Sequence, residues 1–236
     1  MVEIGGDQQV QSEVLEGLAT AVNHRRWFVE LALPYLGDDP IEVGSGLGDY
    51  ALEWAERIPR LTATEADPER LVKLKERMTD HPGVNVRELL LPTEESAGYS
   101  AAVSYNVLEH IKDDVEALRS MARLVRPGGA IVLIVPAFPF AMSRVDVATG
   151  HFRRYTRRSM ATALHDAGLR IEKLCYVNAL GLLGYYMATS VFKLAPKEGP
   201  MVKAYDRFVL PLTKGCERLV RTPFGQSVFT VARVPG

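Results

Sequence analysis

The sequence has few of the features that narrow a protein class at once. Its two cysteines, Cys175 and Cys216, lie far apart and show no metal-ligand spacing. This excludes a cysteine-ligated metal site and indicates a reducing compartment. The 28 basic and 29 acidic residues give a net charge of −1, so no overall positive charge indicates nucleic acid as a partner. The start, with Glu3 and Asp7, lacks an apolar signal core, which predicts a cytoplasmic location.

Long apolar runs are scarce as well. One stretch of 18 residues, from Cys175 to Phe192, carries no charge and just reaches the length of a membrane span. Asn178, Thr189 and Ser190 interrupt its apolar character, as do two glycines. We therefore predict a buried or cleft-lining segment and no transmembrane span, while interfacial contact with lipid stays open. There are no internal repeats and no low-complexity tracts.

What the sequence does contain is the pattern of one α/β domain. With 236 residues, 47% of them apolar, the chain can bury one substantial core. Strand and helix patterns alternate along most of it. We expect a first strand that begins at residue 41 and further strands at 61–65, 84–91, 101–105, 130–135, 170–177 and 227–233. Helices are expected at 12–35, 50–57, 68–78, 115–125, 156–167 and 202–220.

This order of elements predicts a doubly wound, mainly parallel sheet with right-handed crossovers and helices on both faces. Ligands of such sheets bind beyond the carboxyl ends of the strands. The stretch 44–48, Glu65 and Asn106 are all expected at that edge. Between Pro136 and Arg154, prolines, aromatics and arginines follow no clean period, which predicts a long functional loop.

The segment from Ile41 to Ala51 is the most informative one, because a short buried strand breaks there into a glycine turn. Gly44, Gly46 and Gly48 allow positive φ angles and bring the backbone close to a ligand. The helix that follows directs its free N–H groups to the same place. The third glycine comes one residue too early for the dinucleotide fingerprint, and the Gly-Lys-Ser/Thr ending of a P-loop is missing.

The pattern E-x-G-x-G-x-G that begins at Glu42 resembles the first motif of the class I S-adenosylmethionine-dependent methyltransferases. The string 63–71 resembles their second motif, and the string 105–111 is very similar to the V-L-E-H motif of many small-molecule and lipid methylating enzymes. The turn 126–129 matches the proline-glycine-glycine turn of the same superfamily. These four motifs cover 41–135 in the right order, and dehydrogenases do not share the set.

The resemblance implies a Rossmann-like methyltransferase fold. Its seven-stranded, mainly parallel sheet has helices on both faces, an antiparallel final strand, an N-terminal helix and a C-terminal lid-like insertion. On this basis the chain is a single domain: a helical cap (1–37), a cofactor-binding core (38–135), an acceptor loop with a helical lid (136–224) and a terminal strand (225–236).

The resemblance also implies S-adenosyl-L-methionine as cofactor, with S-adenosyl-L-homocysteine as product. Glu42 would orient the glycine loop, Glu65 would bind the ribose, and Asn106 would face the methionine or sulfonium side. An arginine of the segment 23–27 would pair with the cofactor carboxylate, although a solvated helix face explains that segment equally well. The implied cofactor-binding residues are Glu42, Gly44, Ser45, Gly46, Gly48, Glu65, Ala66, Asn106 and Arg26.

One position departs from the family pattern. Many relatives have an aspartate near the adenine after the third strand, whereas this chain reads Glu-Leu-Leu-Leu-Pro at 88–92. The adenine would then be held by apolar contact and backbone groups, with Glu88 as a weak substitute.

The sulfonium methyl is already activated, so a general base is required only for an alcohol or a protonated amine as acceptor. His151, Tyr155 and His110 are the candidate catalytic residues, although a structural or cofactor-side role is favoured for His110. The pair Glu109-His110 resembles part of the metal-binding Glu-x-x-Glu-His motif of coenzyme Q and RNA-end methyltransferases. Because Asn106 replaces the first acid of that motif, we expect no metal.

The acceptor is expected near the segment 151–158, which holds four arginines. Arg153 and Arg154 suit a phosphate or carboxylate on the acceptor, or they tie the loop to Asp146 and Asp166; both alternatives stay open. The apolar stretch 180–192 would line a greasy acceptor pocket, as would four aromatic side chains. These are Phe138, Phe140, Tyr185 and Tyr186.

The function that follows is methyl transfer from S-adenosylmethionine to a small-molecule or lipid-like acceptor, with oxygen as the favoured acceptor atom. Two alternatives are kept. Methylation of RNA or protein is disfavoured by the balanced charge. A non-catalytic module that binds the cofactor is disfavoured by the intact glycines and Glu65, although a cofactor site does not establish turnover.

Overall fold

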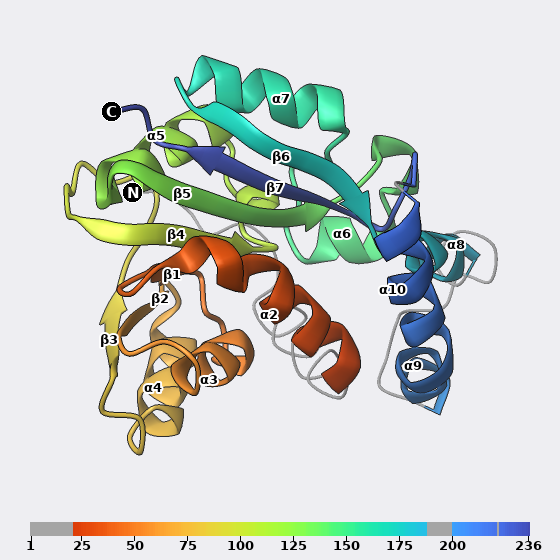
Figure 1. The fold of residues 1–236 in the computed structure, drawn as a ribbon, viewed down its shortest axis with the longest axis horizontal. Coiled ribbons are helices and arrows are strands. Elements are labelled where there is room, and N and C mark those ends of the chain that lie inside the picture. The colour runs from red at the N-terminus through yellow and green to blue at the C-terminus, as the bar shows by residue number, and fades with distance from the viewer. Residues whose placement is uncertain (1–20, 188–199, 221) are drawn as a thin grey trace.

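The computed structural model describes residues 21–187, 200–220 and 222–236. Within these residues, seven strands form one sheet in the order β3-β2-β1-β4-β5-β7-β6 (Figure 1). The strands are β1 (Ile41–Val43), β2 (Leu61–Glu65), β3 (Val84–Glu88), β4 (Tyr99–Tyr105), β5 (Val125–Pro136), β6 (Arg170–Val177) and β7 (Ser227–Arg233).

The pairing of the strands confirms the predicted doubly wound sheet. β1 is parallel to β2 and β4, β2 is parallel to β3, and β4 is parallel to β5. β7 lies between β5 and β6 and is antiparallel to both. The parallel strands therefore end at one edge of the sheet, where a ligand site is expected.

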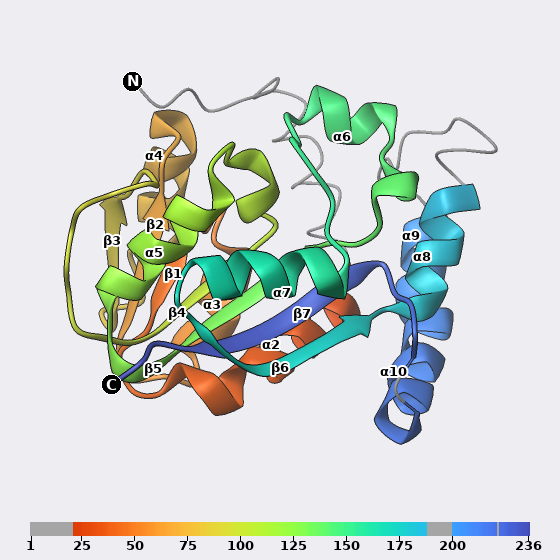
Figure 2. The ribbon, with the colours of Figure 1, turned by 90° about the horizontal axis from the view of Figure 1, so that it is seen from above.

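Helices cover both faces of the sheet through two separate apolar clusters (Figure 2). On one face, α2 (Val22–Leu36), α3 (Asp49–Ala55) and α4 (Pro68–Arg77) contribute large buried side chains such as Phe28, Trp54 and Leu74. On the other, α5 (Asp114–Leu124) and α7 (Arg157–Asp166) contribute Leu118 and Met160. The first part of the predicted helix 12–35 lies outside the described residues.

The predicted irregular loop from 136 to 154 contains more structure than expected. It holds η2 (Pro139–Ala141) and the short helix α6 (Arg144–Ala148). A capping box, in which Ser143 and Asp146 exchange hydrogen bonds, starts α6. Such a box satisfies free N–H groups of a first turn, so a helix too short for a visible period can still form.

Further helices lie beyond the carboxyl ends of β5 and β6 (Figure 1). They are α8 (Ala179–Tyr186), α9 (Pro200–Ala204), η4 (Tyr205–Val209) and α10 (Leu210–Leu219). The last three fall in the predicted helical stretch 202–220. The uncharged segment begins in β6 and continues through α8, and its end, 188–192, lies outside the described residues. In the parts of the chain given above, no helix has the length and hydropathy to cross a membrane.

Candidate active site

A glycine loop joins β1 to α3 at the carboxyl edge of the sheet. Gly44, Gly46 and Gly48 have φ angles of 75°, 56° and 84°, a region that residues with a Cβ rarely enter. A Cβ on Gly44 would lie 2.5 Å from a methyl carbon of Val107, and one on Gly48 would lie 2.6 Å from Met78. The loop therefore needs glycine for its conformation and for the packing around it.

Glu65, the last residue of β2, holds this loop in place. Its Oε2 accepts a hydrogen bond from the N–H of Gly46 at 2.8 Å, and its Oε1 accepts from the N–H of Asp67 at 3.0 Å. Arg70 contacts the same Oε1 at 3.3 Å. Asp67 itself caps the start of α4, and Ala66 is half-buried. Because a carboxylate oxygen can accept two hydrogen bonds, Oε2 keeps one acceptor position.

Glu42 of β1 is buried next to the loop. Its Oε2 accepts a hydrogen bond from Ser45 Oγ at 2.7 Å, and this Oγ accepts from the N–H of Thr64 at 3.1 Å. Burial raises the pKa of Glu42 to about 8 against the effect of the Ser45 hydrogen bond, and the charges of Glu65 and Asp49 act in the same direction as burial. In the ligand-free protein Glu42 is therefore largely protonated near neutral pH.

This raised pKa makes the stability of the ligand-free protein depend on pH. The folded state binds an extra proton between the ordinary pKa of Glu42, 4.5, and its folded value of about 8. The stabilisation of the folded state by this proton is fully present below pH 4.5 and is lost as the pH rises through about 8. Relative to Glu42→Gln, we expect the free energy of unfolding to fall by roughly 2–4 kcal/mol across this window. Denaturant unfolding at several pH values measures it.

The exposed Glu56→Gln variant is the control for the Glu42 measurement. It is expected to keep the pH dependence of the unaltered chain. A pH dependence that survives in Glu42→Gln would show that Glu42 does not carry the extra proton.

The turn after β4 reaches the glycine loop. Asn106 is exposed and has a φ angle of 54°, and its N–H donates to the carbonyl of Ile134 at 2.8 Å. The neighbouring Val107 packs against Gly44. The structure thus brings the two most specific sequence motifs together at one edge of the sheet.

Glu109, His110 and His151 form a cluster next to this turn. The first two belong to η1 (Leu108–His110), and the N–H of Phe152 donates to the carbonyl of Glu109 at 2.8 Å, which places His151 beside them. Nε2 of His151 lies 4.0 Å from Oε1 of Glu109, and the two imidazole centroids are 4.5 Å apart. Each residue offers one donor atom, and the three atoms lie within 4.8 Å of one another.

Burial controls the charge of this cluster. The side chain of Glu109 is fully buried, and within the described ranges neither carboxylate oxygen has a hydrogen-bond partner. Burial raises the pKa of Glu109 to about 7, although the charge of His151 lowers it. Burial lowers the pKa of His110 to about 4, and His151 acts in the same direction. His110 is therefore a neutral imidazole near neutral pH.

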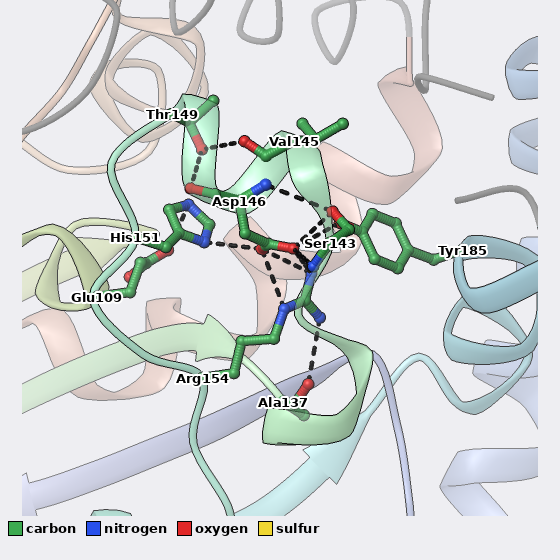
Figure 3. Close-up of polar contacts among 9 residues, drawn as sticks. All are labelled: Glu109, Ala137, Ser143, Val145, Asp146, Thr149, His151, Arg154 and Tyr185. Carbon is green, nitrogen blue, oxygen red and sulfur yellow. Dashed lines mark hydrogen bonds and ion pairs between the residues drawn. The ribbon is translucent and has the colours of Figure 1, made fainter. Parts of the chain in front are cut away.

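Asp146 of α6 collects polar contacts around the cluster (Figure 3). Its Oδ1 lies 2.8 Å from Nδ1 of His151, and Arg154 donates to both carboxylate oxygens at 2.8 and 3.0 Å. Ser143 and Tyr185 donate to Oδ2 at 2.7 and 3.0 Å. Burial alone would raise the pKa of Asp146, but the His151 hydrogen bond and the Arg154 charge hold that pKa well below its usual range. Asp146 therefore fixes the orientation of the His151 ring.

Two of the four arginines of the segment 151–158, Arg153 and Arg154, contact acids of the chain, as one of the two sequence alternatives expected. Arg154 binds Asp146, as described. Arg153 binds Asp114 at 2.7 Å, whereas the sequence suggested Asp166 as the second acid. These contacts use the guanidinium groups for holding the segment in place.

The three predicted catalytic residues do not all meet. His110 and His151 lie together, whereas the hydroxyl of Tyr155 donates to Oδ2 of Asp114 at 2.8 Å. Tyr155 is buried in the core, and burial raises its pKa. Glu109, which in the sequence stands out only as part of a motif, belongs to the cluster, whereas Tyr155 does not.

The two neighbouring arginines of α2 differ in exposure: Arg25 lies on the core side of the helix and Arg26 on the solvent side. Arg26 has a side chain that is 59% exposed and lies 3.7 Å from Glu53. Arg25 is 18% exposed, lies 3.4 Å from the same carboxylate, and its charge reaches Tyr50 at the start of α3. Helical spacing could have found this, because Arg25 precedes the buried Phe28 by three residues and lies on its side of the helix.

Aromatic rings from η2, β6 and α8 lie against one another. The ring centroids of Phe138 and Tyr176 are 4.7 Å apart, those of Phe138 and Phe140 5.2 Å, and those of Phe140 and Tyr186 5.9 Å. Phe140 and Tyr186 are exposed. Three of the four predicted acceptor aromatics thus form one group, whereas Tyr185 belongs to the Asp146 contacts.

The segment after β3 is apolar. Leu89 and Leu91 are buried, while Leu90 and Glu88 are exposed.

A parallel sheet whose first strand ends in a glycine loop, and whose second strand ends in an acid, defines the class of α/β domains that bind a nucleoside-containing ligand. Residues 25–174 match the profile of the family described as "Methyltransferase domain". The chain belongs to this family.

Proteins of similar sequence are also named as methyltransferases. An uncharacterized methyltransferase of Mycobacterium tuberculosis is 33% identical over 100 residues, which are 42% of this chain and 51% of that protein. A ubiquinone biosynthesis O-methyltransferase of Xanthomonas axonopodis pv. citri is 26% identical over 163 residues, 61% of this chain and 68% of that protein. The chain thus spans about half the length of its mycobacterial relative.

Solved structures share the fold. A geranyl diphosphate C-methyltransferase from Streptomyces coelicolor has a TM-score of 0.60 at 16% identity and covers 87% of this chain and 77% of its own. A cyclase has a TM-score of 0.58 at 18% identity, with coverage of 89% and 81%. Since one of these proteins is named for cyclisation, the fold alone does not define the reaction.

Proposed function

We propose that the chain transfers the methyl group of S-adenosyl-L-methionine to a hydroxyl oxygen of a small or lipid-like acceptor. The observation that carries the proposal is the meeting of the glycine loop, Glu65 and the turn at Asn106 at one edge of the sheet. The cluster of Glu109, His110 and His151 continues directly from that turn.

The residues at this edge fit the cofactor. The three glycines lack the side chains that would keep a ligand from the backbone, and Oε2 of Glu65 keeps an acceptor position for a ribose hydroxyl. Glu42 lies beside the loop for the amino acid portion. Arg25, less exposed than Arg26, is our choice for the cofactor carboxylate.

The cofactor supplies a methyl group on a sulfonium, whose C–S bond breaks as the acceptor oxygen bonds to carbon, leaving S-adenosyl-L-homocysteine. The chain's own task is to align the acceptor with that methyl group, exclude water and receive the hydroxyl proton. His151, oriented by Asp146, and the neighbouring Glu109 are the groups assigned to the acceptor hydroxyl.

The acceptor is assigned to the region of η2 and α8. The exposed rings of Phe140 and Tyr186 offer an apolar wall, which suits an acceptor with an apolar body. The relative named for ubiquinone biosynthesis and O-methylation supports oxygen as the acceptor atom. Since Arg153 and Arg154 already bind acids of the chain, an anionic group on the acceptor is not part of the proposal.

Transfer of labelled methyl tests this function. We expect the purified chain to move label from S-adenosylmethionine into the organic-soluble fraction of an extract of bacterial lipids and small metabolites. His151→Ala is expected to lower the rate by about 100-fold or more, the usual effect of losing a group that takes part in proton transfer. The exposed His165→Ala is the matched control and should keep the full rate.

Two results would contradict the proposal. Label that enters tRNA or protein in place of the organic fraction would favour the macromolecular alternative. Binding of S-adenosylmethionine in calorimetry without any transfer would favour a non-catalytic module.

A further inference from the structure

We infer that Glu109, His110 and His151 bind one divalent transition-metal ion, of the class that includes Mn²⁺, Co²⁺ and Zn²⁺. The binding of the ion stands on the geometry of these residues alone. Its use in catalysis, argued below, rests on the proposed function.

The cluster contains buried polar atoms that have no partner in the part of the chain that the structure describes. These are both carboxylate oxygens of Glu109 and Nδ1 of His110. Buried polar groups almost always have a partner, and an unpaired buried carboxylate is especially costly. Among the described residues, His151 is the basic side chain within 4.0 Å of this carboxylate. A bound cation would supply what Glu109 lacks.

The donor atoms of the three residues are spaced closely enough to share one ion. They lie within 4.8 Å of one another, with Nε2 of His151 4.0 Å from Oε1 of Glu109. Metal bonds of about 2.0–2.2 Å at tetrahedral angles separate two ligand atoms by roughly 3.4 Å. Small side-chain rotations therefore suffice to close the three donors around one ion.

Further residues hold these side chains in place. Metal-binding histidines usually have a carboxylate or a backbone carbonyl on the second ring nitrogen. Asp146 lies 2.8 Å from Nδ1 of His151, so Nε2 is left for the ion, and Arg154 fixes Asp146 in turn (Figure 3). The ring of His110 forms a hydrogen bond with the backbone of Thr149.

The donor set selects the kind of ion. Two imidazole nitrogens and one carboxylate oxygen suit transition metals, whereas Mg²⁺ and Ca²⁺ prefer oxygen ligands alone. Within the motif that contains Glu109 and His110, Asn106 replaces the first acid, so the motif alone offers too few donors for a metal. The third donor is His151, which lies 41 residues after His110 and which the fold brings beside it.

The proposed methyl transfer gives the ion a role. Three protein ligands leave coordination positions open, and the cluster follows directly on the turn that contacts the glycine loop. With the ion bound, His151 and Glu109 act as its ligands and no longer accept the hydroxyl proton directly. A hydroxyl oxygen of the acceptor would occupy an open position on the ion, which makes its proton easier to release to solvent. The acceptor class is then a compound that presents a hydroxyl as a metal ligand.

Titration of the metal-free chain with Co²⁺ tests the inference without cofactor or acceptor. We expect one Co²⁺ per chain, with an absorption spectrum of nitrogen and oxygen ligands and no thiolate band. Glu109→Gln and His151→Ala should weaken binding by about 100-fold or more, and Asp146→Asn by about 10–100-fold, the effect typical of a residue that orients a ligand. The exposed His165→Ala should bind as the unaltered chain does.

Absence of stoichiometric Co²⁺ binding would overturn the inference, as would unchanged affinity in folded Glu109→Gln and His151→Ala. A buried water molecule would then satisfy Glu109. If circular dichroism finds the variants unfolded, the melting temperature of the unaltered chain shows whether the ion binds. We expect this melting temperature to rise with Co²⁺ or Zn²⁺, because an ion that binds only the folded state stabilises that state. These readouts stay informative even if no methyl transfer is found.

Discussion

Replacing Glu65 by alanine is expected to weaken the binding of S-adenosylmethionine by about 10- to 150-fold. The remaining acceptor position of Oε2 serves one ribose hydroxyl, and a hydrogen bond to a charged group contributes about 1.5–3 kcal/mol. The variant also removes the acceptor for the N–H of Gly46, which loosens the glycine loop. Isothermal calorimetry with S-adenosylmethionine and S-adenosylhomocysteine measures both affinities.

The neighbouring acid Glu69 provides the matched control. It is exposed on α4, so Glu69→Ala should bind the cofactor normally. Arg25→Ala and Arg26→Ala belong in the same series, with a loss of affinity expected only for Arg25. If a folded Glu65→Ala chain binds as tightly as the unaltered one, the ribose assignment is wrong.

Replacing Asp146 by asparagine is expected to lower the free energy of unfolding by about 3–5 kcal/mol, the usual cost of breaking a buried ion pair from one side. The substitution leaves the guanidinium of Arg154 buried without its charged partner. It also weakens the acceptor for Ser143 and Tyr185. Denaturant unfolding in a metal chelator measures this loss without any contribution from a bound ion.

A double variant separates the ion pair from other effects. Asp146→Asn combined with Arg154→Met removes both charges, so its loss of stability should be clearly smaller than the sum of the two single losses. Asp166→Asn, at a half-exposed side chain, should change stability by less than about 0.5 kcal/mol. Additive losses in the double variant would show that the pair is not the source of the effect.

The elements that sequence patterns predicted best are strands that are rich in apolar or β-branched residues and are bounded by polar turns. β2, β6 and β7 begin and end where expected, because apolar and β-branched residues between polar turns are a strong strand signal. β5 begins earlier than expected, at Val125, because the turn at Gly128 is itself paired: its N–H donates to the carbonyl of Val234 at 2.9 Å. That partner lies far along the chain, where local patterns carry no information.

Some site residues could likewise be predicted from local patterns, and others could not. The glycine loop and Glu65 lie in continuous motifs and could be read directly. The environment of His151 could not, because it depends on the short helix α6 and on the Phe152 hydrogen bond to η1. Helical spacing already separates the directions of Arg25 and Arg26, so the sequence alone offers a reason to test Arg25 beside the predicted Arg26.

The position of β7 has a consequence for how the chain assembles during synthesis. β6 pairs with β7 and with no other strand in the described sheet, and β7 follows it by about 50 residues. While the ribosome adds those residues, β6 has no strand to pair with. The nascent chain can therefore order its five parallel strands first, and β6 joins the sheet only when β7 emerges.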